Sequence, residues 1–213
     1  MPKKSGIVLV IAGAVLILSA LLLFLHNDLE ARRAGQASER LLTQLEEILE
    51  TTAPEENTVP TETALDPEMP VVDIDGHGYV GYLEIPDLEL KLPVLAEWSY
   101  PNLQIAPCRE LGSSRTDDLI IAAHNYWTHF GQLKKLPEGA VVTFTDMDGI
   151  QNTYTVAQNY ALDPSRTEVV YSSGYPLVLY TCTPGGDYRQ VVMCLRTEQG
   201  NDGEITPMGS HEM

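Results

Sequence analysis

Cysteine and positive charge are both scarce in this chain, and each shortage excludes a class of protein. Three cysteines in 213 residues are too few and too widely spaced for a disulfide scaffold. They form no C-x-x-C pair, and no His/Cys set has the spacing of a structural zinc site, so we expect no metal and no cofactor. Lys and Arg total 13 against 30 Asp and Glu, and the net charge of −17 argues against a nucleic-acid partner.

One long apolar run stands near the start of this acidic chain. Residues 6–25 are uncharged and almost wholly apolar, and their number matches the roughly 20 residues that a helix needs to cross a bilayer. A cleaved signal peptide has an apolar core of only about 7–15 residues, followed by small residues at the cleavage site. Polar residues beginning with His26 follow here instead. We therefore predict a retained, single-pass transmembrane helix.

Basic residues beside the apolar run predict its orientation. Lys3 and Lys4 lie in the short segment 1–5, which places the N-terminus in the cytoplasm and the later residues outside the cell. Arg32 and Arg33 on the other side weaken this assignment, because the rule counts Lys and Arg rather than net charge. We expect a protein of the cell membrane with an extracellular folded domain.

A juxtamembrane helix and a linker are expected next. Residues 26–50 predict a helix, with a stripe of leucines and isoleucine on one face from Leu41 to Leu49. Such a stripe can bind a partner, but it more often packs on the protein's own domain or lies near the membrane. Residues 51–70 hold four prolines and five acidic residues, which is typical of an extended linker.

The folded domain is expected over residues 71–198, with a polar tail over residues 199–213. Short β-rich runs alternate with turn signals, of which Asp148-Gly149 between two such runs is a strong hairpin signal. Several short strands with little helix after Asp163 predict an all-β barrel or sandwich.

Two of the expected strands end at residues with reactive side chains. An apolar strand reaches Cys182, and a Gly-Gly loop then leads to a strand that opens on Arg189. A thiolate beside a fixed cation is a good nucleophile, although a lone strand cysteine is more often a buried structural residue. Residues 119–123 form another apolar strand, which ends at His124. A Cys and a His that each close a strand can meet in a folded site.

Taken together, these segments resemble the sortases. That family has a T-L-x-T-C strand end, a downstream strand that begins with Arg, and an upstream apolar strand followed by Gly-His. The matching residues here are 178–182, Arg189 and 122–124. Val178 stands where the family has its first Thr, and Ala123 where it usually has Gly. The Asn after the histidine and the N-terminal anchor look closer to the class B type.

The resemblance covers about residues 79–196 and implies both a fold and an activity. The fold would be mainly β, a closed eight-stranded sortase-type barrel with short helices. Cys182 would attack a C-terminal sorting motif of a substrate protein and form a thioester, which an amine acceptor such as a cell-wall precursor or a surface-protein lysine would then resolve. His124 would act as acid and base, and Arg189 would stabilise the tetrahedral intermediate.

Other residues of these types compete for the same roles. His129 is the second choice for the acid/base, and Asn125 and Thr181 are candidate supporting residues. Cys108 and Cys194 either form a disulfide or remain separate, with Cys194 as a small core residue. We expect three other histidines to be inert: His26, His77 and His211. Three arginines in turns are expected to be surface charges, namely Arg109, Arg115 and Arg166, and Arg196 lies at the far end of the last strand from Cys182.

Two other functions remain open. In a cysteine endopeptidase, water rather than an amine would resolve the thioester. A surface-displayed β-barrel binding module would have no catalysis at all, and the joint presence of Cys182, His124 and Arg189 at strand ends counts against it.

Overall fold

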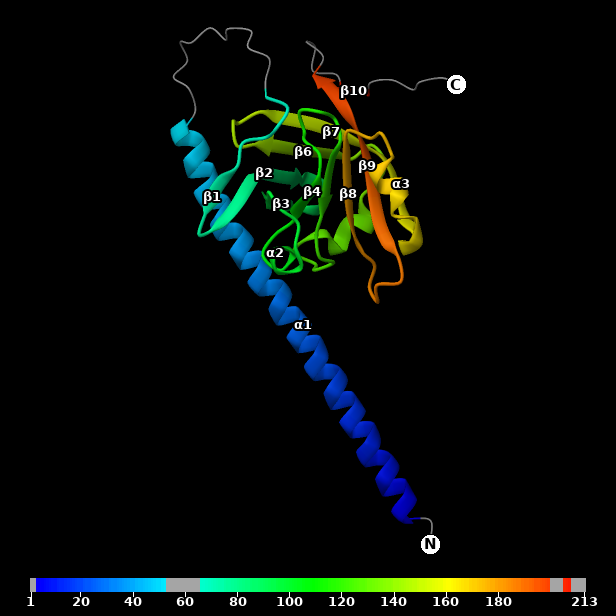
Figure 1. The fold of residues 1–213 in the computed structure, drawn as a ribbon. Coiled ribbons are helices and arrows are strands. Elements are labelled where there is room, and N and C mark those ends of the chain that lie inside the picture. Colours follow the sequence, from blue (N-terminus) through cyan, green and yellow to red (C-terminus); the bar gives the residue numbers. More distant parts are fainter. Residues whose placement is uncertain (1–2, 53–65, 200–204, 208–213) are drawn as a thin grey trace, which may run out of the picture.

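The computed structural model describes the chain over residues 3–52, 66–199 and 205–207. Its strands form one sheet that closes into a barrel (Figure 1). Eight of them make the ring in the order β2-β3-β4-β5-β8-β9-β7-β6, and β6 pairs back to β2. β1 adds to β2 and β10 adds to β9. The predicted closed, eight-stranded, mainly β fold is confirmed.

Short helical turns connect some of the strands, and the long helix α1 precedes them all. The strands are β1 Val72–Ile74, β2 His77–Ile85, β3 Leu90–Leu95, β4 Cys108–Leu111, β5 Leu119–Ala122, β6 Val141–Asp146, β7 Gln151–Leu162, β8 Leu177–Cys182, β9 Arg189–Gln199 and β10 Ile205–Pro207. The helices are α1 Lys3–Thr52, η1 Pro86–Leu88, α2 Tyr100–Leu103, η2 Phe130–Lys135, η3 Pro164–Arg166 and α3 Glu168–Tyr171.

The interior of the barrel is a single apolar cluster, and two neighbouring strands of its wall are covered on both faces. All four residues of β5 are buried, as are the first three of β8. This explains their continuous apolar sequences, because a strand with two buried faces needs no polar alternation. β5 and β8 are parallel, with Leu119 opposite Leu177 and Ala122 opposite Tyr180.

The predicted β6–β7 hairpin is present and is fixed by a buried carboxylate. The Asp146 side chain accepts hydrogen bonds from the backbone N–H groups of Asp148 and Ile150, at 2.9 and 3.0 Å. It also pairs with Arg115 at 2.8 Å, and the two side chains are 0% and 6% exposed. Arg115, expected to be a surface charge, is therefore part of a buried ion pair that joins two loops.

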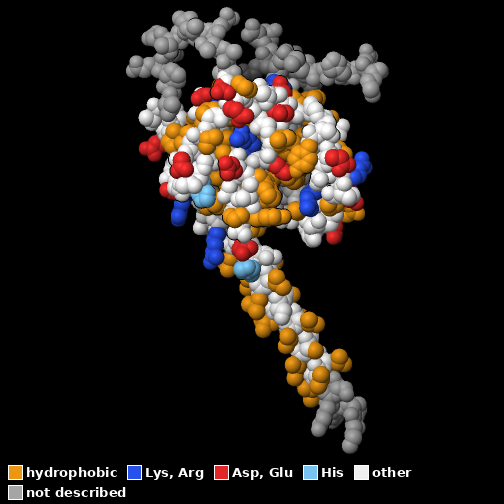
Figure 2. Space-filling view, viewed as in Figure 1, with side chains coloured by type: hydrophobic (Ala, Val, Ile, Leu, Met, Phe, Trp, Pro, Cys, Tyr) orange, Lys and Arg blue, Asp and Glu red, His pale blue; other side chains and the backbone are white. Residues whose placement is uncertain are grey.

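The N-terminal helix is one continuous element rather than two. α1 spans 50 residues and includes both the expected transmembrane segment 6–25 and the expected juxtamembrane segment 26–50. Within the described residues it is the one helix long and apolar enough to cross a membrane. Figure 2 shows hydrophobic side chains along the part that projects from the barrel.

The second half of α1 packs on the barrel. Leu45 is 0% exposed and contacts a cluster that includes Tyr79, Leu95 and Cys108. Leu41, Ile48 and Leu49 pack against the same cluster. The stripe from Leu41 to Leu49 therefore packs on the protein's own domain, as its spacing predicts. Lys91 of β3 adds an ion pair to Glu46 of α1 at 2.8 Å.

The expected linker and tail are only partly described. Residues 53–65 of the expected linker 51–70 lie outside the described residues. Its end is packed, because Met69 is 3% exposed and belongs to the barrel core. Most of the expected tail 199–213 also lies outside the described residues, but residues 205–207 pair with β9 as β10.

Replacing Leu45 by Ala tests the docking of α1. Removing a fully buried leucine side chain costs about 2–5 kcal/mol, so we expect faster amide hydrogen exchange over the second half of α1 and a lower free energy of unfolding. Leu29 lies on the same helix and is 52% exposed. Leu29→Ala is the matched control, and equal effects of the two changes would contradict the docking.

Candidate active site

Cys182 is the last residue of β8, and its side chain is exposed. Because side chains alternate along a strand, it shares the outer face of the barrel wall with Tyr180 and Val178. Leu177 and Leu179 face the barrel core. The strand therefore holds the thiol at the rim of the barrel, where a large molecule can reach it.

The other two cysteines are buried in separate apolar clusters. Cys108 and Cys194 are each 0% exposed, and none of the three cysteines is in a disulfide. Burial raises the pKa of the Cys108 thiol to about 12 and also raises that of Cys194. Both thiols stay protonated at neutral pH, so Cys182 is the accessible thiol.

Arg189 lies directly across the β8–β9 ladder from Cys182. Residues opposite each other in an antiparallel pair have Cα atoms roughly 4.5–5.5 Å apart, so the cation and the thiol start from neighbouring backbone positions. The Arg189 guanidinium donates to the carbonyl oxygens of Gly186 and Tyr188, at 3.3 and 3.4 Å. The guanidinium therefore turns back onto its own loop.

The loop between these two residues is a compact turn. Thr183 donates its N–H to the Tyr188 carbonyl at 2.9 Å, and its hydroxyl accepts from the Tyr188 N–H at 3.1 Å. Gly185 and Gly186 have φ values of 90° and 83°, which residues with a Cβ rarely adopt. Thr183 therefore closes the loop that joins Cys182 to Arg189, a role that its position next to the cysteine did not reveal in the sequence.

His124 follows β5 at the same rim of the barrel. The last register pair of β5 and β8 is Ala122 with Tyr180, so His124 and Cys182 each lie two residues beyond it on parallel strands. The buried Thr181 hydroxyl donates to the Ala123 carbonyl at 2.7 Å. This bond joins the residue before the cysteine to the residue before the histidine.

The electrostatic surroundings of His124 favour its neutral form. Partial burial lowers its pKa, and the negative charge of Glu30 on α1 opposes this shift. The ring packs on Tyr126, with the two ring centroids 4.9 Å apart. Asn125, a candidate supporting residue, is exposed.

His129 is enclosed between the barrel and α1. It is 0% exposed, and its Nε2 lies 3.4 Å from the Ser38 hydroxyl of α1. Burial, and then the nearby His124, lower the pKa of His129 to about 4. Its ring packs at a tilt against Tyr126, with the two ring centroids 5.6 Å apart. The ring is neutral at physiological pH and has no open face for a substrate, which makes it a packing residue of this segment.

A carboxylate held by two tyrosines lies on the same outer face as Cys182. Glu110 of β4 accepts hydrogen bonds from the hydroxyls of Tyr180 and Tyr171. Burial and the bond to Glu110 raise the pKa of Tyr180. This group has no local signal in the sequence, because its members come from β4, β8 and α3.

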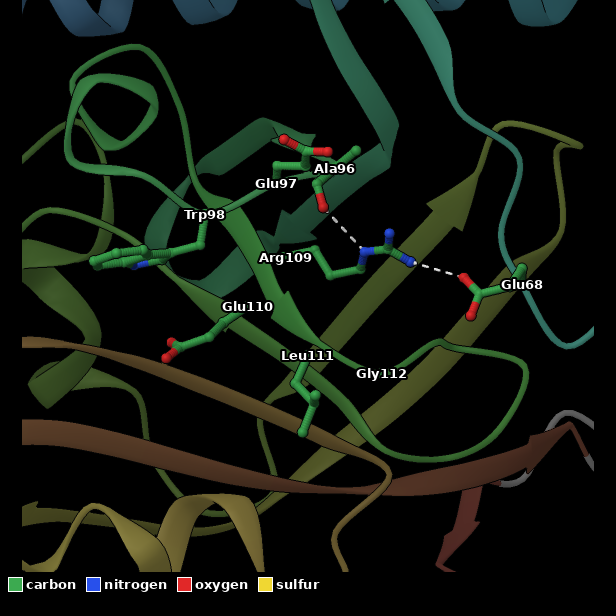
Figure 3. A pocket seen from close by; sticks show the side chains of 8 residues that line it. All are labelled: Glu68, Ala96, Glu97, Trp98, Arg109, Glu110, Leu111 and Gly112. Atoms are coloured by element: carbon green, nitrogen blue, oxygen red, sulfur yellow. Dashed lines mark hydrogen bonds and ion pairs between the residues drawn. The ribbon is translucent and has the colours of Figure 1, made fainter.

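Glu110 also lines a pocket of about 570 Å³, shown in Figure 3. Arg109, the cation in this wall, donates to the Ala96 carbonyl at 3.1 Å and pairs with Glu68 at 3.3 Å. Glu97 and Trp98 border the other side. Neither the exposed thiol nor His124 lines the pocket, and its Glu110 is hydrogen-bonded to Tyr180 on the thiol's face.

The rim thus combines an exposed thiol, an imidazole and a guanidinium on three strand ends. A thiol can attack a carbonyl carbon, an imidazole can move a proton, and a guanidinium can stabilise an oxyanion. No cluster of three or more His, Cys, Asp or Glu residues suited to a metal ion occurs within the described ranges. This set of groups is suited to acyl transfer through a covalent intermediate.

Thr181→Val tests the bond between the two strand ends. The change keeps the shape but removes the hydroxyl, leaving the buried Ala123 carbonyl without this donor, so we expect the free energy of unfolding to fall by about 1–3 kcal/mol. Thr181→Ser retains the hydroxyl and should stay near wild type in urea unfolding. Similar losses for Val and Ser would show that the hydrogen bond contributes little.

His129 should make stability depend on pH. Above about pH 6.5 the histidine is neutral in both the folded and unfolded chain. As the pH falls from about 6.5 to about 4, the unfolded chain takes up a proton that the folded chain excludes, so stability falls by up to roughly 3 kcal/mol from this residue. Urea unfolding of wild type and His129→Gln at pH 7 and pH 4.5 measures the difference, and parallel losses would contradict the assignment.

Comparisons with known proteins show which proteins this chain is similar to. A family model described as the sortase domain matches residues 83–197, more than half of the chain. A comparison with curated proteins gave no match. Among solved structures, sortase C1 from Streptococcus agalactiae is 26% identical with a TM-score of 0.51, over 60% of this chain and 72% of that one. Sortase C1 from Streptococcus suis is 25% identical with a TM-score of 0.50, over 59% and 76%.

A third structure shows the same fold at lower identity. Sortase A from Corynebacterium diphtheriae is 18% identical with a TM-score of 0.53, over 59% of this chain and 64% of that one, which is less than two thirds of its length. These structures are named as sortases A and C1, and the likeness to class B remains a prediction. With the closed eight-stranded barrel and the family match together, the chain belongs to the sortase family of cysteine transpeptidases.

Proposed function

We propose that this protein is a membrane-anchored extracellular transpeptidase with Cys182 as nucleophile, His124 as acid/base and Arg189 as oxyanion stabiliser. The observation that carries the proposal is the position of the exposed Cys182 at the end of β8, opposite Arg189 in β9 and beside the strand end that leads to His124.

Acylation uses the thiol and the imidazole. Neutral His124 accepts the proton of the Cys182 thiol, and the resulting thiolate attacks the carbonyl carbon at the scissile peptide bond of a sorting motif, so that the carbonyl oxygen takes the negative charge. The C–N bond then breaks, and His124 in its protonated form gives its proton to the leaving amine. The products are a thioester on Cys182 and a free C-terminal fragment of the substrate.

Resolution of the thioester reverses these roles. Neutral His124 accepts a proton from the incoming amine, which attacks the thioester carbonyl and displaces the Cys182 sulfur. The amine belongs to a cell-wall precursor or to a lysine of a surface protein. Arg189 stabilises the oxyanion in both steps, since a guanidinium stays charged at any working pH and offers several donors in a fixed fork.

The exposed apolar half of α1 supports membrane anchoring. The helix crosses the bilayer once through residues 6–25, with the N-terminus in the cytoplasm and the barrel outside. The same side chains would have no favourable environment in water, because almost all of residues 6–25 are exposed in the isolated chain.

Water is the competing acceptor. If water resolves the thioester, the protein is a cysteine endopeptidase with the same first step. If no thioester forms, the barrel is a binding module. The exposed thiol opposite a cation favours acyl transfer over the binding module, and the acceptor separates the two enzymes.

The test uses the full chain in detergent, a library of sorting-motif peptides and an amine acceptor, with intact mass as the readout. We expect a peptide-sized adduct on wild type that transfers to the amine. Cys182→Ala should form no adduct, and His124→Gln and Arg189→Lys should slow turnover about 100-fold or more.

Matched variants control for the substitutions themselves. His77→Gln, at the start of β2, and Arg196→Lys, toward the far end of β9, make the same chemical changes at positions away from the rim and should retain wild-type turnover. An adduct released only as free acid identifies an endopeptidase. An adduct on Cys182→Ala, or full activity of His124→Gln, contradicts the assigned roles.

A further inference from the structure

We propose that the Cys182 end of the barrel faces the bilayer at short range and rests on the lipid surface through aromatic side chains of its rim loops. This inference rests on the membrane anchoring proposed above and adds the orientation of the domain. It depends on how α1 is joined to the segment that carries His124.

The helix leaves little distance between the bilayer and the barrel. α1 runs without interruption from the apolar segment into the half that packs on the domain. Ala31, the first buried residue after the apolar segment, comes six positions after Leu25. At a rise of about 1.5 Å per residue, the first helix–barrel contact lies about 9 Å along the axis from the end of the apolar segment.

The first contacts are made with the His124 segment itself. The Thr128 hydroxyl donates to the Ala31 carbonyl of α1 at 2.8 Å. Gly35 packs so closely on Thr128 that an added Cβ would lie 2.9 Å from its methyl group. Ser38 then meets the buried His129 at 3.4 Å. Three successive turns of α1 therefore hold the loop that follows His124, on the part of the helix nearest to the bilayer.

The strand directions place Cys182 at the same end. β5 and β8 are parallel, so both finish at the rim that carries this loop. Figure 1 shows the loop between β8 and β9 reaching toward the side on which the N-terminal half of α1 leaves the barrel. β10 lies at the opposite end of the molecule in the same view.

The loops of this rim expose aromatic rings. Trp127, three residues after His124, is 51% exposed, and Tyr188, next to Arg189, is 50% exposed. Tryptophan and tyrosine are the residues enriched where proteins meet the membrane–water interface. Leu29, on the turn of α1 between the apolar segment and the barrel, is 52% exposed. The exposed side chains of Trp127, Tyr188 and Leu29 form an apolar edge that continues the apolar segment of α1. A lipid surface matches the chemistry of this edge.

A test of orientation can use the enzyme's own thiol. Cys182 is exposed and the other two cysteines are buried, so a thiol-reactive fluorophore labels this site in the otherwise unchanged chain. The full chain is reconstituted in phosphatidylcholine–phosphatidylglycerol vesicles that contain a lipid with a spin label on its headgroup, which quenches nearby fluorophores. We expect at least threefold stronger quenching at Cys182 than at a far-end control position.

The control position is Thr116, in Cys182→Ala, Thr116→Cys. Thr116 is exposed and precedes the start of β5, so it lies beyond the end of the barrel opposite to Cys182. Equal quenching at the two sites, or stronger quenching at Thr116, would overturn the proposal.

A second variant moves the barrel away from the bilayer with almost no rotation about the axis of α1. Seven residues of helix-forming sequence inserted after Asn27 add about 10.5 Å to the helix and change its phase by only about 20°. Quenching at Cys182 should fall at least twofold, and transfer from a lipid-tethered sorting-motif peptide on a short linker should fall at least fivefold. Transfer from the soluble peptide should not change. Unchanged quenching after the insertion would overturn the inference.

The two proposals fail in different ways. If wild type forms no adduct with soluble peptides in detergent, the proposed function is wrong whatever the quenching shows. If the adduct forms normally but quenching does not distinguish the two ends, the transpeptidase assignment stands and the orientation is wrong.

Discussion

The parallel pairing of β5 with β8 is the constraint on which the candidate site depends. Parallel strands finish at the same edge of a sheet, so this pairing brings His124 and Cys182, 58 residues apart in the sequence, to one rim of the barrel. The antiparallel return through β9 then places Arg189 opposite the thiol. Closure of the ring by β2 and β6 fixes both strands in a wall whose inner face is the core.

The strands, and the positions of the candidate site residues at strand ends, could be predicted because each has a local signal. Continuous apolar runs ending in Cys182 and His124 predict buried strands, and Asp148-Gly149 predicts the hairpin that the structure contains. The closed order of the strands came from the resemblance to a known family, because a run of short strands is equally compatible with a sandwich.

Other features had no local signal. The pair of Arg115 with Asp146, the burial of His129 against Ser38 and the contacts of Glu110 each join residues that are 31 to 91 positions apart. The continuity of α1 could have been inferred, since no proline occurs between Pro2 and Pro54. The polar residues after Leu25 end the segment that is suited to lipid, but they leave the backbone hydrogen bonds of the helix uninterrupted.

The burial of Met69 has a consequence for the kinetics of the helix–barrel contact. α1 is docked through Leu45, and the chain is docked again at Met69, so only a short covalent connection separates two fixed points. Such a connection keeps a detached partner at an effective concentration on the order of millimolar. Re-docking of α1 is therefore a first-order event that does not depend on the protein concentration. Lowering the density of the protein in the membrane therefore does not change the fraction of molecules in which α1 is docked on the barrel.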